Sequence, residues 1–79
     1  MNNAALDRQL LKAHAEADKP ALVRLYTQAA DQSEAGGDVG AACFYLTHAF
    51  VFALEIGAPE AEQLNARLVE KGRAHPLKP

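Results

Sequence analysis

The residues of this chain that are best suited to catalysis or metal binding are three histidines and one cysteine. His14, His48 and His75 stand far apart in the sequence, and Cys43 precedes His48 by less than two helical turns. A nucleophilic Cys43 would need a histidine as its base. At about 100° per residue, however, Cys43 and His48 lie on different sides of one helix. No His-Glu-x-x-His, Glu-x-x-His or Cys-x-x-Cys pattern occurs, so we expect no catalytic residue, no metal and no cofactor.

His48 is the histidine whose neighbours are most suggestive of a site. On a helix it shares a side with Phe44 and Val51, and Glu55 follows two turns later. A small-molecule or metal site at His48 would need a partner from another helix, and His14 is the obvious candidate. The alternative interpretation is a half-buried histidine at a point where two helices cross.

These residues belong to the most apolar stretch of the chain, which runs from Gly37 to Gly57. Between residues 41 and 54 only Thr47 and His48 are polar. Such a pattern predicts a helix that is buried on several sides. Residues 39–54 would span about 24 Å as a helix, which is shorter than the ~30 Å hydrocarbon core of a membrane, so no membrane span is expected.

Helix-breaking residues on both sides of this stretch define the other elements. Proline suits the first turn of a helix, and glycine suits the position after its end. Pro20, Pro59 and the pair Gly36-Gly37 therefore separate helical segments, and Asp38 is a good N-cap for the third. The sequence predicts an all-α fold of two antiparallel helical hairpins with a central, apolar third helix. The four helices are expected at about 3–18, 20–35, 38–56 and 59–71.

Length and composition limit the remaining possibilities. The 79 residues suffice for one small domain, 1–73, and we expect 74–79 to be a loosely ordered tail. Ten acidic and eight basic residues give a net charge of −2 without a basic stripe, which argues against nucleic-acid binding. The first residues do not resemble a signal peptide, and a single cysteine forms no internal disulfide, so a cytoplasmic location is expected.

The chain also shows signs of an internal repeat. At an offset of 39 residues Pro20 falls on Pro59, and the first and second helices fall on the third and fourth. Two copies of a helical hairpin would produce such a match.

A second pattern runs through the middle of the chain. An aromatic residue is followed four places later by a small one, then come a Gly-Asp turn, a small–large–small helical pattern and a proline. These positions are Tyr26 and Ala30, Gly37-Asp38, Ala42, Leu46 and Ala49, and Pro59. Residues 26–59 thereby resemble a tetratricopeptide (TPR) unit. The segment departs from the family in its longer second helix and in Ala29 and Ser33, which replace a large residue and a tyrosine.

The resemblance implies antiparallel helices and a groove that binds a peptide or a partner helix. In known TPR domains the first helices of each pair line this groove. The corresponding candidates here are Arg24, Thr27, Gln28 and Asp31, which lie outside the apolar set expected for the second helix. That apolar set is Leu22, Leu25, Tyr26, Ala29 and Ala30, with Ser33 as a further candidate. The leading hypothesis is a small TPR-like protein–protein interaction module without catalytic activity, and the alternative for these four residues is an ordinary solvated helix face.

A different hypothesis concerns the opposite side of the third helix. A chain of this size can leave one side of an apolar helix uncovered, and large exposed apolar patches mark interfaces. The candidate apolar interface is Phe44, His48, Val51 and Glu55. It would make the protein a self-associating helical bundle, a homodimer with a structural or scaffolding role. A small-molecule or metal site near His48 is the third hypothesis.

Overall fold

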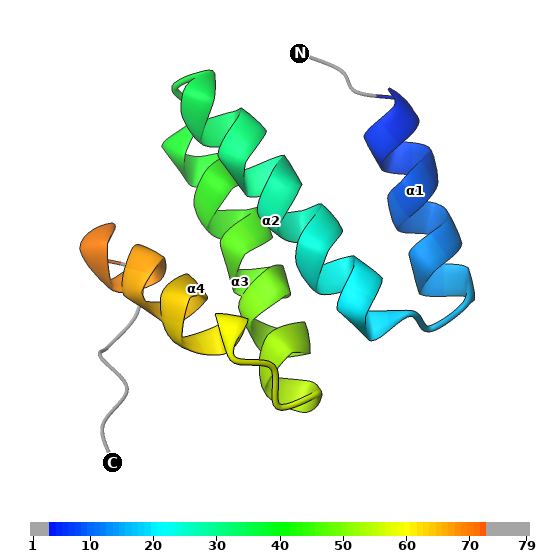
Figure 1. Cartoon of the computed structure of the whole chain (residues 1–79). Coiled ribbons are helices and arrows are strands. Elements are labelled where there is room, and N and C mark those ends of the chain that lie inside the picture. The colour runs from blue at the N-terminus through cyan, green and yellow to red at the C-terminus, as the bar shows by residue number, and fades with distance from the viewer. Residues whose placement is uncertain (1–3, 73–79) are drawn as a thin grey trace.

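The structure, a computed structural model, describes residues 4–72, and over that range it contains four α-helices and no strand (Figure 1). The helices are α1 (Ala4–Ala15), α2 (Lys19–Ala35), α3 (Val39–Glu55) and α4 (Glu60–Glu70). The prediction of an all-α fold built of helical hairpins is confirmed. The tail expected at 74–79, together with His75, lies outside the described residues.

Three similar turns connect the helices. Ala17, Gly37 and Gly57 have positive φ angles of 53°, 83° and 65°, and they follow one another at intervals of 20 residues. In each turn the following N–H donates to a carbonyl five residues back, as at the end of many helices. The three bonds are Asp18 to Ala13 (2.9 Å), Asp38 to Ser33 (2.9 Å) and Ala58 to Ala53 (2.8 Å). The hairpin repeat read from these turns is therefore 40 residues, from Ala17 to Gly57.

Aspartates begin the two middle helices. The Asp18 carboxylate accepts a hydrogen bond from the Ala21 N–H (3.2 Å), and the Asp38 carboxylate accepts one from the Ala41 N–H (3.0 Å). Both aspartates thus satisfy an N–H group that a helix leaves unpaired at its start. The predicted first helix, 3–18, extends too far at its carboxyl end, because α1 ends at Ala15 and Asp18 caps α2.

The α2–α3 pair forms the centre of the molecule, with α1 packed on α2 and α4 packed on α3. Leu46 is fully buried, as are four alanines whose small side chains let the helix backbones approach closely. The alanines are Ala30, Ala42, Ala49 and Ala53. Val23 is also buried, although the pattern of the second helix had not included it, because α2 is covered on two sides: by α1 and by α3 with α4.

The molecule is flat, so part of α3 stays uncovered. Its Cα atoms extend over 37 × 29 × 13 Å, and the smallest dimension is about the depth of two packed helices. Among the described helices, only α2 and α4 approach the backbone of α3, and α1 does not. The outer side of α3 therefore faces solvent. None of the helices within residues 4–72 is both long enough and apolar enough to cross a membrane.

Candidate functional site

A groove between α2 and α4 is the site that matches the sequence-based candidates. It has a volume of about 570 Å³. Its lining residues are Pro20, Val23, Arg24, Thr27, Gln28, Asp31 and Glu60. The structure thus brings all four predicted groove residues to one concave surface, which we call the α2–α4 groove. Glu60 had not been singled out, because its place beside α2 depends on how α4 packs on α3.

The polar groups of the α2–α4 groove differ in what they offer a partner. The Thr27 hydroxyl donates to the Val23 carbonyl (2.7 Å), so it is already engaged within α2. Arg24 and Gln28 are exposed, and neither Arg24 nor Glu60 forms an ion pair with any residue in the described range 4–72. One guanidinium and one carboxylate in this groove therefore remain available for a ligand.

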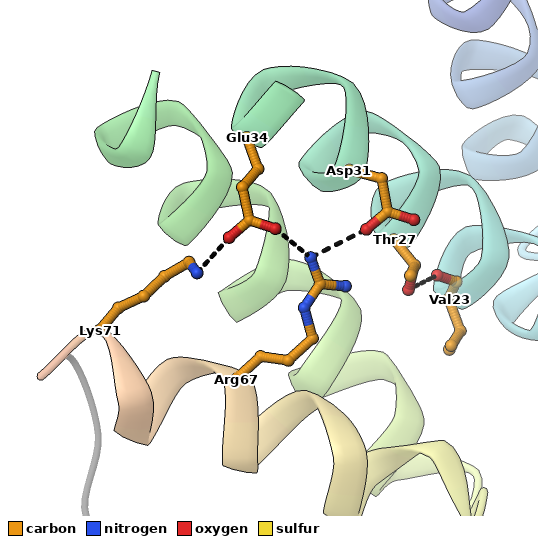
Figure 2. Close-up of polar contacts among 6 residues, drawn as sticks. All are labelled: Val23, Thr27, Asp31, Glu34, Arg67 and Lys71. Atoms are coloured by element: carbon orange, nitrogen blue, oxygen red, sulfur yellow. Dashed lines mark hydrogen bonds and ion pairs between the residues drawn. The ribbon is translucent and has the colours of Figure 1, made fainter. Parts of the chain in front are cut away.

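An ion-pair cluster joins α2 to α4 at the Asp31 end of the groove. Arg67 lies 2.8 Å from Asp31 and 3.2 Å from Glu34, and Lys71 also pairs with Glu34. Figure 2 shows these two basic side chains reaching from α4 to α2. No backbone contact joins the two helices, so the cluster is a side-chain bridge. The Lys71 ammonium, by hydrogen bond and by charge, lowers the pKa of Glu34, and Arg67 adds to this effect.

A second hollow lies between α1 and α2, and the sequence analysis did not identify it. It has a volume of about 320 Å³, and its lining includes Lys12 from α1 and Glu16 from the turn after α1. Arg24 and Gln28 line this hollow as well as the α2–α4 groove. These two side chains therefore form a polar ridge that separates two adjacent concave surfaces.

An aromatic cluster on the other side of the molecule joins α1, α2 and α3. Tyr26 is at its centre, with ring centroids at 5.8 Å from His14, 5.0 Å from His48 and 6.1 Å from Phe52. The Tyr26 hydroxyl is also 2.8 Å from His14 Nε2. Burial, and to a smaller extent the neighbouring Tyr45, raises the pKa of Tyr26. This cluster explains how α1 is tied to α3 without contact between their backbones.

The two histidines of the aromatic cluster both contact Tyr26, but their arrangement gives the hypothesis of a metal site no support. Within residues 4–72 no group of three or more His, Cys, Asp or Glu side chains is arranged to hold a metal ion. His48 Nδ1 lies 2.9 Å from the Phe44 carbonyl of its own helix, so one ring nitrogen is engaged. Cys43 is buried in the core shared by α2, α3 and α4, away from solvent.

The candidate apolar interface lies on the uncovered side of α3. Phe44 and Val51 are exposed by 57% and 45%, and Leu54, which the sequence did not place with them, is exposed by 52%. His48 is half-buried against Phe44, whose ring centroid is 4.4 Å away. Glu55 pairs with Lys19 of α2 (3.3 Å), so it borders this surface as part of an ion pair.

Comparisons with protein-family models, with curated proteins and with solved structures found no match to this chain.

Proposed function

We propose that this protein is a small, non-catalytic interaction module that binds a peptide segment of another protein in the α2–α4 groove. The observation that carries the proposal is the meeting of Arg24, Thr27, Gln28 and Asp31 in one groove of about 570 Å³. A groove of this size accepts a few side chains of a peptide. The Arg24 guanidinium and the Glu60 carboxylate form no ion pair within residues 4–72, so they offer charged contacts to such a ligand.

The resemblance to a TPR unit supports the same choice of site. By that resemblance α2 is the first helix of a unit, α3 the second, and α4 the first helix of the next unit. In TPR domains the first helices line the peptide groove, and α2 and α4 line the groove here. We propose a reducing cytoplasm as its compartment, since the lone Cys43 is buried as a free thiol.

The proposal is tested by selecting peptides from a random library on the immobilised full chain and then measuring their affinity by calorimetry. Arg24→Glu should weaken a selected peptide by about tenfold, because it reverses a free charge on the groove wall. Arg8→Glu is the matched control, since Arg8 is an exposed arginine on α1 without an ion pair to the described residues. Equal affinities for wild type, Arg24→Glu and Arg8→Glu would count against this groove.

A further inference from the structure

The hollow between α1 and α2, which we call the α1–α2 hollow, holds two basic side chains that form no ion pair. Lys12 lines it from α1 and Arg24 lines it from α2, and both residues are exposed. Neither forms an ion pair with any residue in the range 4–72. Two such cations on one concave surface can both donate hydrogen bonds to a single carboxylate.

The geometry of the two helices brings these bases toward each other. α1 and α2 run antiparallel on either side of a short turn (Figure 1). Lys12 lies three residues before the end of α1, and Arg24 lies five residues after the start of α2. Side chains tilt toward the amino end of their own helix. Lys12 therefore leans away from the turn and Arg24 leans toward it, so their charged groups approach the same height.

The acidic residues of the α1–α2 hollow are confined to the end beside the turn. The Asp18 carboxylate accepts a hydrogen bond from the Ala21 N–H (3.2 Å), so it is engaged as the cap of α2. Glu16 lies in the turn after α1 and pairs with neither base. Farther from the turn, Gln9 and Gln28 line the hollow with amide groups, which can also donate to a carboxylate. The part of the hollow away from the turn thus offers donors to an acidic group.

The α1–α2 hollow and the α2–α4 groove lie next to each other across one helix. Arg24 and Gln28 line both of them. A peptide that lies in the groove therefore reaches the hollow by crossing the ridge that these two residues form. The crossing is about 10 Å, one helix diameter, which an extended peptide covers with about three residues.

We propose that the α1–α2 hollow is a subsite for an acidic side chain of the peptide that occupies the α2–α4 groove. An Asp or Glu of the peptide, about three residues from the part in the groove, binds between Lys12 and Arg24. This inference rests on the proposed function and adds to it the class of partner, a segment with an acidic residue at this spacing. The contact is exposed to solvent, so its contribution to affinity is modest.

Calorimetry with peptides selected from the random library on the wild-type chain tests the subsite. Lys12→Gln should weaken their binding about threefold, because it removes one of the two cations and keeps most of the side chain. Arg8→Gln is the matched control, since Arg8 is an exposed base of α1 that does not line the hollow and forms no ion pair with residues 4–72. Circular dichroism verifies that both variants fold. Equal affinities for the two variants overturn the subsite.

A change in the peptide tests whether its acidic residue is the group that Lys12 binds. Exchanging this residue for its amide should weaken binding to the wild-type chain about threefold, and binding to Lys12→Gln by less. An equal loss on both chains overturns the subsite, as do selected peptides that lack an acidic residue.

The same measurements separate the subsite from the groove itself. Weaker binding to Arg24→Glu with unchanged binding to Lys12→Gln would leave the proposed function standing and refute the subsite. Unchanged binding to both variants, or a library that yields no binding peptide, would count against the groove and the subsite together.

Discussion

The α2–α4 groove and the exposed side of α3, which we call the α3 outer stripe and which carries Phe44, His48, Val51 and Leu54, are stabilised in different ways. The groove is bordered by charges that reach from one helix to another, as Arg67 and Lys71 do toward Asp31 and Glu34 (Figure 2). On the outer stripe, by contrast, polar groups are satisfied within α3 and apolar side chains remain exposed. The groove therefore presents charged side chains to solvent, and the stripe presents apolar ones.

The difference follows from how many helices meet on each side. α4 packs on α3 and thereby brings its own charged face close to α2, which creates a concave surface between two helices. On the outer side none of the helices within residues 4–72 covers the centre of α3, and α1 reaches α3 through side chains such as the rings of His14 and Phe52, 5.9 Å apart. One side therefore gains a groove, while the other keeps a convex apolar helix.

Both surfaces depend on the common core, so the largest effect is expected there. Leu46 has no exposed surface and lies in the core between α2, α3 and α4. Leu46→Ala should lower the free energy of unfolding by about 3 kcal/mol, since it removes buried methyl groups and leaves a cavity. Urea denaturation followed by circular dichroism measures the change. Leu11→Ala, on exposed surface, is the control and should change it by less than about 0.5 kcal/mol.

Substitutions in the turns between the helices should have the next largest effect on the free energy of unfolding. Gly37 has φ of 83°, and Gly37→Ala should lower the free energy of unfolding by about 1 kcal/mol. Ala17 has the same kind of conformation at φ of 53°, so Ala17→Gly should raise it by about 0.5 kcal/mol. Thermal denaturation of the two variants compares them directly. A change of the same sign in both would contradict the equivalence of the two turns.

The hydrogen bond that attaches α1 to α2 can be removed without adding a charge. Tyr26→Phe keeps the ring contacts with His48 and Phe52 but removes the hydroxyl that bonds His14. The free energy of unfolding should fall by about 0.5 kcal/mol, since the bond is exposed. Hydrogen exchange should report faster opening of α1 amides, with α4 amides as the internal reference. Unchanged exchange in α1 would argue against this link.

A substitution in the ion-pair cluster between α2 and α4 should have the smallest effect on stability, and this effect should depend on pH. Lys71 lowers the pKa of Glu34 from its ordinary value of 4.5, so Glu34 stabilises the fold above that value. This contribution is lost as the pH falls through the lower pKa of the folded state. Glu34→Gln should therefore be slightly less stable than wild type at pH 7 and equal to it in strong acid. Salt should reduce the difference at pH 7, because the pairs are exposed.

Local features of the fold could be predicted from the sequence alone. Proline, glycine and aspartate act within a few residues, so Pro20, Gly37 and Asp38 placed the helices to within one to three residues. Helical periodicity likewise identified the buried face around Leu46 and the outward position of Phe44. The end of α1 was misplaced because Ala17 takes a left-handed conformation that alanine rarely adopts.

The tertiary structure decided which distant residues share a surface. Four residues of α2 could be assigned to one helix face, but the groove exists only because α4 packs on α3 and adds Glu60. The burial of Val23, the bond between His14 and Tyr26, and the ion pairs of Arg67 were equally inaccessible, because helix spacing does not specify how separate helices cross. The sequence determined the helices and their faces, and packing determined which faces meet and which remain exposed to solvent.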